Sequence, residues 1–550
     1  MHIDSSSTKS KDGQVYTRHL LRQSIRDGRK VNKRTIANLS HCSPEEIVAI
    51  KLALRNKHDL SQVGSLSKDV EVHQGTSFGA TYVLKNIAER IGLVKALGQT
   101  IDGKLALWQV IARLMNQGSR LSAVRLAEQQ SAVPILDMEA FNEDDLYSNL
   151  DWLSDHQALI EQSLYEHRFS QHEEFFLYDI TSSYLEGTQN ELASWGYNRD
   201  KKNGKMIIVV GLLCDQQGIP MSIEVFDGST SDCTTVKAQM DKIAKRWGVG
   251  SITLVGDKGM IQGPQIQEIT EAGHSFITTI RKAAIEPLVV GAGYQTHLID
   301  EDILEIIEGD YRYLVRRNPV QAKETSANRK ALISTIEYLI TKENRYLEEH
   351  KKATIAKSLD RVTKKIKKFK LEEITKIAVK EGARELVITI DPSALDKATH
   401  LDGCYAMKTN LKNERFSKQL VHDKYKALSL VEDAFRCSKT ELLEMRPIHV
   451  RLQKRTRGHV FVVMLAYLIV KELERCWKSL NMTTEEGLDT LRSYQTVDLH
   501  AKGRSVLKTV PRPNKVTKQL FDLAKVEIPN QIPSSDIHVD TRKKLGKDRK

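Results

Sequence analysis

The spacing of hydrophobic and polar residues varies along this chain. In the first 170 residues it predicts a hairpin followed by helices. The segment 14–36 has Asp27-Gly28 between stretches rich in Val, Tyr, Thr and Arg, which predicts a small β-hairpin with a basic face. Ser43-Pro44-Glu45-Glu46 combines an N-cap, a proline at the first helical position and early acids, so a helix is predicted to start there. From about 78 to 170 the apolar residues recur at helical spacing, which predicts an all-α unit.

Short apolar runs after residue 173 predict a group of strands. The expected elements are strands at 175–181, 206–214 and 219–226, a helix at about 234–247, and a strand at 251–255. The turn at 215–218 joins the second and third strands into a hairpin. One acid, Asp179, interrupts the first strand, and another, Asp257, follows the last strand in a Gly-Asp-Lys-Gly turn.

The second half of the chain predicts a mixed insertion and a late pair of helices. The expected elements are a strand at 311–315, a charged helical stretch at 328–380, strands at 386–390 and 404–409, and a helix from about Tyr425 to Lys439. The Lys-rich helices suit either a clamp on a phosphate backbone or ordinary solvated faces. The apolar run 460–470 falls short of the roughly 20 residues that span a bilayer, so it predicts a buried core helix. The C-terminal residues, rich in proline and ending in TRKKLGKDRK, predict a weakly ordered basic tail.

Composition bounds the class of protein without identifying it. A chain of 550 residues exceeds the roughly 250–300 that one hydrophobic core can serve, so several domains are expected. Apolar residues at 40% and charged residues at 28% are ordinary for a globular protein and exclude wholesale disorder. The net charge of +12 favours an anionic partner such as nucleic acid. The six cysteines form no C-x-x-C pair and the N-terminus has no apolar signal region, which fits a reducing cytosol.

Two acids carry the first chemical signal. A carboxylate within an apolar strand, such as Asp179, is costly to bury unless it is paired or binds a cation. Asp257 follows a strand, where ligands of open α/β sheets bind. Two such acids on neighbouring strands would suit a hard divalent cation. The alternatives are a hydrogen-bonded structural acid for Asp179 and an ordinary turn residue for Asp257.

A third acid lies on the predicted late helix. Tyr425, Glu432, Arg436 and Lys439 are separated by seven, four and three residues, which predicts that they share one helical stripe. The opposite stripe is apolar, with Leu428, Val431 and Phe435. The alternative is an exposed face that carries a Glu432–Arg436 salt bridge.

These residues resemble a known family, the DDE transposases of bacterial insertion sequences, in the cut-and-paste group with the motif Tyr-x2-Arg-x3-Glu-x6-Lys. Tyr425, Glu432 and Lys439 match the motif, whereas Leu428 stands where the motif has arginine. The resemblance extends over YDITSSYLEG (178–187), GLLCDQQGIPMSIEVFDGSTSD (211–232), VGDKGM (255–260), DGCYAMKTN (402–410) and RTRGHVFVVMLAYLI (455–469). The N-terminal hairpin region is similar to the start of one branch of the group.

The resemblance implies an α/β fold in which an insertion domain interrupts an RNase H-like mixed-sheet core. A small N-terminal α+β unit and an all-α unit precede this core. The expected domains are 1–75 for a basic unit that binds DNA ends, 76–172 for the all-α unit, 173–282 and 396–480 for the two halves of the core, 283–395 for the insertion and 481–550 for the basic tail.

The resemblance also implies the site residues. Asp179, Asp257 and Glu432 would be the catalytic carboxylates and would hold two Mg²⁺ ions, for which Mn²⁺ would substitute. The expected DNA contacts are Lys439 and Tyr425 by the motif, Arg436 in place of the missing arginine, and Lys258, Arg455 and Arg457 on the backbone. Relatives that cut through a DNA hairpin stack a flipped base on an aromatic of the insertion, where Tyr294, Tyr311 and Tyr313 are the candidates here.

The implied function is a DNA transposase that binds the inverted-repeat ends of an insertion sequence. It would cleave them by two-metal hydrolysis and join the 3′-OH ends to target DNA. The partners would be double-stranded DNA and a second copy of the chain on paired ends, in the bacterial cytoplasm at the nucleoid and without a membrane. The alternatives are a domesticated, catalytically silent DNA-binding regulator and a structure-specific RNase H-like nuclease.

Overall fold

The computed structural model divides the chain into two compact units. It describes residues 1–10, 12–28, 30–58, 70–168, 174–291, 303–440, 442–501, 504–533 and 537–539. The first unit is formed by Met1–Thr76, Gln495–Arg512 and Pro529–Ile532, and the second by the remaining segments. The predicted basic tail sequence TRKKLGKDRK lies outside the described residues.

The first unit contains two small sheets in its described part. One sheet has the order β1 (His2–Lys9), β2 (Val15–Asp27) and β3 (Lys30–Asn38), and the other has the order β16 (Arg504–Thr509), β15 (Gln495–Ala501) and β4 (Val70–Ser77). The predicted hairpin is confirmed, since Asp27 opposes Lys30 across the β2–β3 turn. The predicted helix is confirmed as α1 (Pro44–Arg55), in which Ser43 and Glu46 form a capping box.

The strand β1 was not predicted. Its sequence HIDSSSTK has few apolar residues, so no alternation marks it. It pairs with β2 along its whole length, and Asp4 forms an ion pair with Arg22 on that neighbouring strand. Backbone hydrogen bonds and side-chain contacts with β2 therefore hold β1 in place. The sequence of β1 alone does not reveal this pairing.

Helices form the part of the second unit that precedes its large sheet, as predicted. They are α3 (Gly79–Arg90), α4 (Leu93–Leu97), α5 (Ile101–Met115), α6 (Arg120–Gln129), α7 (Ala132–Leu136) and α8 (Glu143–Arg168). The late helix α17 (Gln453–Trp477) packs against α5 and α8, and its residues 458–470 are buried, which confirms the predicted core helix. The helices α18 (Thr484–Arg492) and α19 (Lys515–Leu523) pack beside this group. None of the described helices is both long and apolar enough to cross a membrane.

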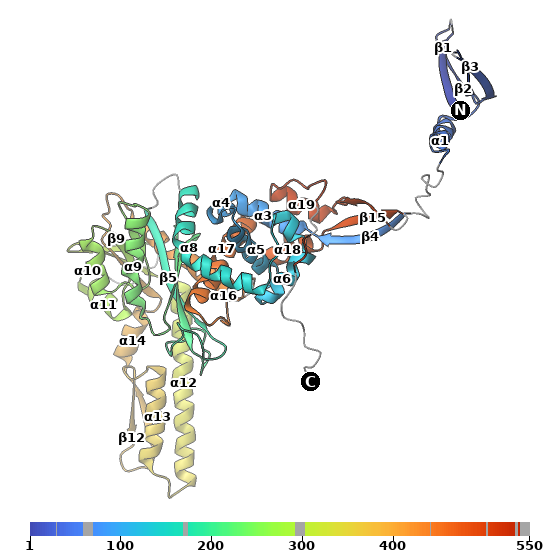
Figure 1. Ribbon diagram of the computed structural model, residues 1–550. Helices are drawn as coiled ribbons and strands as arrows, with labels where there is room; N and C mark the ends of the chain where they lie inside the picture. Colours follow the sequence, from blue (N-terminus) through green and yellow to red (C-terminus); the bar gives the residue numbers. More distant parts are fainter. Residues whose placement is uncertain are drawn as a thin grey trace. The chain divides into compact units, whose positions relative to one another are not determined.

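A mixed sheet forms the centre of the second unit (Figure 1). Its eight described strands run in the order β10 (Leu304–Glu308), β11 (Tyr311–Arg317), β14 (Cys404–Thr409), β9 (Ser275–Thr279), β8 (Thr253–Val255), β5 (Phe175–Tyr184), β6 (Ile207–Cys214) and β7 (Pro220–Phe226). The strands β6 and β7 form an antiparallel hairpin on one side of β5, while β8 and β9 run parallel to it on the other side. This arrangement is RNase H-like, and the predicted fold class is confirmed.

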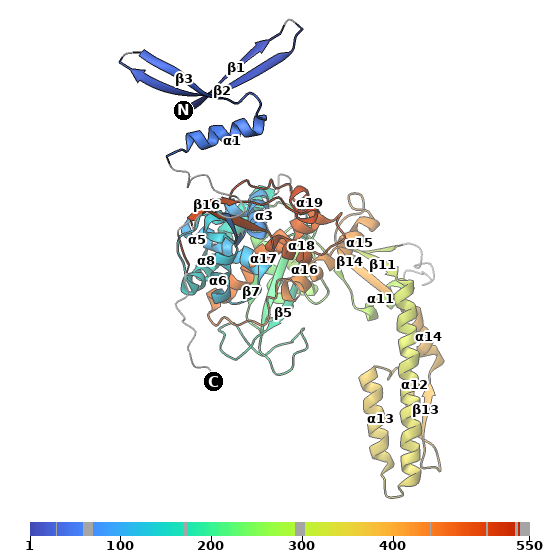
Figure 2. The same ribbon diagram turned by 90° about the vertical axis from the view of Figure 1, so that its right-hand side faces the viewer.

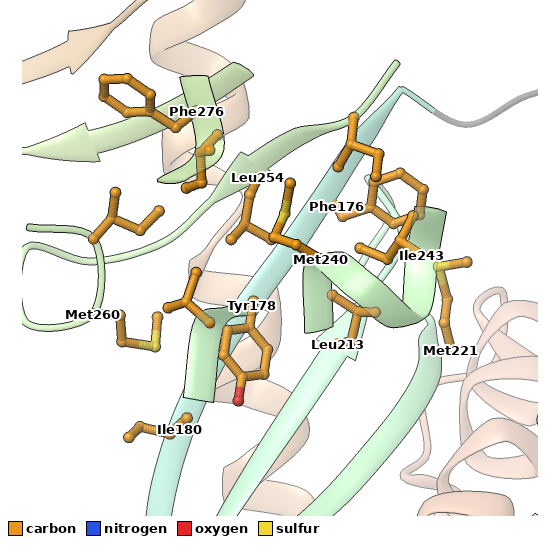
Figure 3. Packing of buried hydrophobic residues seen from close by; sticks show 14 of the residues in the cluster. Phe176, Tyr178, Ile180, Leu213, Met221, Met240, Ile243, Leu254, Met260 and Phe276 are labelled. Carbon is orange, nitrogen blue, oxygen red and sulfur yellow. The ribbon is translucent and has the colours of Figure 1, made fainter. Parts of the chain in front are cut away.

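Alternation along β5 separates a hydrophobic face from a polar one. Phe176, Tyr178 and Ile180 point to the same side of the sheet and pack with Met240, Ile243 and Leu254 in one buried cluster (Figure 3). The cluster is covered by helical turns that the sequence predicted as one helix at 234–247. These turns are a 3₁₀ turn (Asp232–Thr235), α9 (Val236–Asp241) and a π-helical turn (Lys242–Arg246). The following helix α10 (Gly263–Glu271) lies beside α9.

The insertion is a helical pair with a small hairpin and its own core. After α11 (Lys282–Gly291), β10 and β11, it comprises α12 (Pro319–Glu349), α13 (Ile355–Phe369), β12 (Thr375–Val379), β13 (Leu386–Ile390) and α14 (Pro392–His400). Figures 1 and 2 show α12 and α13 side by side, and Ile336, Val362 and Ile366 are buried between the elements of this domain.

One prediction for the insertion is wrong. The helical stretch expected up to 380 stops at Phe369, because Lys370 adopts a left-handed conformation with φ of 56°. The residues Thr375–Val379 then pair with Leu386–Ile390 as a hairpin. The predicted strands at 311–315, 386–390 and 404–409 are confirmed.

Replacement of Gly458 with alanine is expected to destabilise the helical packing. An added Cβ would lie 2.1 Å from the backbone oxygen of Leu150. Because both atoms belong to helix backbones in a close-packed core, relieving this clash requires a helix to move. The expected loss is about 1–3 kcal/mol or more, because overpacking forces the two helices apart. Thermal unfolding of the full chain measures the loss as a lower midpoint. Gly263→Ala is the control, since nothing lies within 4 Å of its added Cβ. Equal midpoints for the two variants would contradict the close approach.

Candidate active site

Three acids that lie far apart in the sequence line one open cavity of about 560 Å³. Asp179 lies within β5 on the side opposite to Tyr178, and Asp257 lies in the turn that follows β8. Glu432 lies in the first turn of α16 (Ser429–Lys439), and α16 packs against β5. The structure therefore brings together the three acids that the sequence singled out.

The environment of Asp179 disfavours its negative charge. Desolvation raises the pKa of Asp179 to about 7, and the carboxylates of Asp257 and Glu432 act in the same direction. The N–H of Ile180, which donates to Asp179 Oδ1 at 2.8 Å, and the charge of Arg199 oppose this rise only in part. A cation in the cavity would stabilise the ionised carboxylate.

Backbone hydrogen bonds hold the carboxylate of Asp257. The N–H groups of Gly259 and Met260 donate to its Oδ1 at 2.8 and 3.1 Å. A Cβ on Gly259 would lie 3.1 Å from the same oxygen, so a side chain there would crowd the acid. This short turn is the local reason that the acid points from the strand end into the cavity.

The helix that the sequence predicted across Tyr425 and Lys439 is two helices. The first, α15 (Lys418–Lys426), ends before Leu428, and hydrogen bonds of the i to i+3 type tighten the junction, as from Leu428 N–H to the Tyr425 carbonyl. The prediction of one continuous helix from Tyr425 to Lys439 is therefore wrong. No glycine or proline marks this break in the sequence, so periodicity alone could not reveal it.

Tyr425 nevertheless stays near the acids. Its hydroxyl lies 3.4 Å from the Thr279 hydroxyl on β9. Burial raises the pKa of Tyr425, and the negative charges of Asp257 and Glu432 contribute to this rise. Leu428, at the position of the missing motif arginine, is buried and lines the cavity.

Lys439 enters the cavity with a buried counter-charge. Its ammonium donates to Asp200 Oδ1 at 2.9 Å, and Arg446 forms an ion pair with the same oxygen. Burial lowers the pKa of Lys439, and the bond to Asp200 opposes this effect. The other Asp200 oxygen is buried without a hydrogen-bond partner in the described part of the chain.

Sequence reasoning missed four charged residues of the cavity, of which Arg446, the second partner of Asp200, is one. Arg199 and Asp200 come from the segment between β5 and β6, and Asp232 begins the 3₁₀ turn before α9. Arg199 forms an ion pair with Asp232 at 2.5 Å. Asp232 ends one of the blocks that carry the resemblance, which was a usable signal, whereas Arg199 and Asp200 have no local pattern.

Only some of the basic side chains that were predicted to contact DNA lie at the cavity. Arg436 lines it and forms an exposed ion pair with Asp433. Lys258 is exposed beside Asp257 and is not among the lining residues. Arg455 forms an ion pair with Asp151 on α8, and Arg457 also lies outside the lining.

The tyrosines that were expected to stack on a flipped base are not found at the cavity in the described part of the chain. Tyr294 lies outside the described residues, and Tyr311 and Tyr313 lie on β11, where the Lys408 ammonium is 3.8 Å from the Tyr311 ring centre. Neither tyrosine lines the cavity.

Two exposed rings instead lie on the segment that carries Arg199 and Asp200. Trp195 is 66% exposed and Tyr197 is 81% exposed. Backbone hydrogen bonds between Ser194 and Ile207 tie this segment to β6 just before Trp195. Sequence reasoning did not identify either ring.

The donor chemistry of the cavity fits a hard divalent cation. Asp179, Asp257 and Glu432 supply oxygen ligands, and a bound cation would offset the burial and the neighbouring carboxylate charges that raise the pKa of Asp179. Within the described ranges, no three Asp, Glu, His or Cys side chains form a ready-made metal-binding group.

Comparison with known proteins gives two family matches. The profile described as the transposase DDE domain matches residues 170–469, which is more than half of the chain. The profile of the IS1634 family transposase N-terminal domain matches residues 3–66. Among curated proteins, none matches the chain significantly.

One similar solved structure is the cryo-EM structure of the piggyBac transposase synaptic complex with hairpin DNA. The two chains are 8% identical with a TM-score of 0.35, over 75% of this chain and 76% of the other.

Replacement of Asp200 with asparagine is expected to destabilise the fold more than loss of an exposed ion pair. Lys439 and Arg446 would keep their charges without a buried counter-charge, which costs about 3–5 kcal/mol. Asp433→Asn, which breaks the exposed pair with Arg436, is the control and should cost under about 1 kcal/mol. Denaturant unfolding of both variants measures the difference. Similar losses would contradict the role of Asp200 as a buried counter-charge.

Proposed function

The chain belongs to the family of transposases with a DDE domain, and from this premise we propose that Asp179, Asp257 and Glu432 are its catalytic carboxylates. The observation that carries the proposal is the convergence of these acids on one cavity from β5, the turn after β8 and the start of α16. The lysine of the same helix, Lys439, lines this cavity too. The acids are therefore within reach of a phosphate that Lys439 contacts.

The three carboxylates would hold two Mg²⁺ ions, for which Mn²⁺ would substitute. When bound, the ions stabilise the charge that develops on the phosphate and leaving oxygens. The chain contributes fixed ligands, since backbone N–H groups hold Asp257 and Asp179 in place. The reaction is hydrolysis at the 3′ ends of the element, followed by attack of each 3′-OH on target DNA.

Positive side chains around the acids would hold the DNA backbone. Lys439 would contact the transferred-strand phosphate, and Asp200 fixes its ammonium for this contact. Arg436 is exposed at the same cavity and Tyr425 lies close to the acids, so both suit contacts with the strand near the cleavage site. Lys258, Arg455 and Arg457 would contact backbone phosphates outside the cavity.

The N-terminal unit would recognise the ends of the element. The strands β2 and β3 carry exposed basic residues along a three-stranded sheet, among them Arg18, Arg26 and Arg34. Such a face contacts phosphates while other side chains read bases in a groove. Two copies of the chain would hold paired inverted repeats in the bacterial nucleoid.

Amide replacements at the three acids are expected to abolish DNA cleavage. Asp179→Asn, Asp257→Asn and Glu432→Gln keep the side-chain size but remove the charge that binds the cations. Gel-based cleavage of an inverted-repeat end in Mg²⁺ should fall by at least about 10³-fold, while end binding stays. Glu268→Gln, an exposed acid on α10, is the control.

The same assay separates the alternatives. Wild-type cleavage by any of the three variants would sink the catalytic assignment. A wild-type chain that binds ends without cleaving them would be a silent regulator, and cleavage without joining to a second duplex would indicate a nuclease.

Removal of the ring at Trp195 is expected to weaken contact with unpaired bases at the cleaved end. The exposed rings of Trp195 and Tyr197, the latter beside Arg199, suit base stacking, which is worth about 1–3 kcal/mol per base. Trp195→Ala should therefore bind a frayed or single-stranded end about tenfold less tightly than wild type. Trp195→Phe keeps a ring and should retain most of the affinity. Fluorescence anisotropy with a fully paired duplex supplies the comparison, and an equal loss for both DNAs would count against stacking.

A further inference from the structure

A second cavity, of about 430 Å³, lies outside the three acids. We call it the arginine pocket, because Arg113, Arg120 and Arg446 line it. The remaining lining residues come from the α5–α6 connection, α8, the segment before α17 and α17 itself: Gln117, Gly118, Ser119, Tyr147, Glu444, Pro447, His449, Val450 and His459. Among these described lining residues, Glu444 is the one carboxylate, and it is exposed.

Two guanidinium groups of the pocket are buried without an ion pair, and the negative charge of Glu444 offsets the burial of Arg113 only in part. Arg113 is 5% exposed and Arg120 is 6% exposed, and neither forms an ion pair with a described acid. The Nε of each has no hydrogen-bond partner in the described part of the chain. A buried, unpaired cation costs several kcal/mol. An anion bound in this pocket would offset that cost.

Neutral partners hold these guanidinium groups in place. Arg113 donates to the carbonyl of Gln117 at 2.8 Å, and Arg120 lies 3.2 Å from His459 Nδ1. The other ring nitrogen of His459 lies 3.3 Å from the Met445 carbonyl, an acceptor only, so Nδ1 is left to accept from Arg120. Burial and the two arginines lower the pKa of His459, which keeps the ring neutral. The imidazole thus orients Arg120 without neutralising it.

The start of α6 adds to the positive potential. Gly118, Ser119 and Arg120 line the pocket at the N-terminus of this ten-residue helix. The Ser119 hydroxyl already accepts the N–H of Ser122, so the cap is complete. The helix end still favours an anion through its dipole.

We infer that the arginine pocket binds a backbone phosphate of the DNA, an inference that rests on the proposed function. Arg446 lines both this pocket and the cavity of the three acids, so the two are neighbours. A strand held at the acids has further phosphates along its length, and a neighbouring pocket of guanidinium groups suits one of them. Tyr147, Pro447 and Val450 supply apolar surface against which a deoxyribose packs.

The test replaces each buried arginine with methionine, which keeps the length of the side chain and removes the charge. Arg113→Met and Arg120→Met should each weaken duplex binding on the order of tenfold, because a charge-assisted hydrogen bond is lost. The slope of log affinity against log salt should fall by about 1. Arg125→Met is the control, since this arginine is exposed on the same helix, and its affinity and slope should match wild type.

Thermal unfolding separates a binding role from a structural one. Inorganic phosphate should raise the midpoint of wild type above that in chloride at equal ionic strength, and this increment should shrink in both variants. The midpoints of the variants in chloride should equal or exceed that of wild type, because an unpaired buried charge is gone. Lower midpoints with unchanged DNA affinity would overturn the inference in favour of structural arginines.

Two other results of these measurements separate the DNA assignment from its alternatives. A phosphate increment that is lost in the variants, together with unchanged DNA affinity, would assign the pocket to free phosphate and overturn the DNA assignment. Cleavage by Glu432→Gln would refute the proposed catalytic site without touching the pocket, because the pocket variants are judged by DNA affinity and not by cleavage.

Discussion

The side-chain alternation of one strand, β5, is the constraint on which the second unit depends. Phe176, Tyr178 and Ile180 fill the core between the sheet and α9, so the register of the strand is fixed by buried apolar surface. The same register directs Asp179 to the opposite face, where α16 packs. A shift by one residue would bury the carboxylate and expose the rings. The core therefore sets the face on which the acid lies, and the N–H of Ile180 then holds its carboxylate.

Charges around the candidate active site fall into two groups. Asp200 and Asp232 are neutralised by Lys439, Arg446 and Arg199, which they hold in fixed positions. Asp179, Asp257 and Glu432 form no ion pair among the described residues. The first group is a scaffold of opposite charges, whereas the second group is left with repulsion that a bound cation would relieve. In the arginine pocket the excess charge is positive instead of negative. Arg446 lines both this pocket and the cavity of the three acids.

The sequence was sufficient where a local pattern carries the information. The strands at 386–390 and 404–409 and the capped helix at Pro44–Arg55 follow from apolar runs and capping residues. It failed where a distant partner decides. The strand β1 exists through β2, and Arg199 and Asp200 reach the site on a segment that is tied to β6. The break between α15 and α16 has no marker residue, so the shared face of Tyr425 and Glu432 could not be tested before the structure.

The insertion leaves the sheet at the end of β11 and returns at the start of β14, and this geometry affects which changes in its length the fold can accept. Arg317 and Cys404 are partners across the β11–β14 ladder, and the N–H of Asn318 donates to the Gly403 carbonyl at 2.9 Å. The whole segment between them thus leaves and rejoins the sheet at one point, like the loop of a very long hairpin. Since closing a loop costs little more free energy as it lengthens, and this one has its own core, the domain is free to be lengthened, shortened or exchanged during evolution without disturbing the register of the sheet.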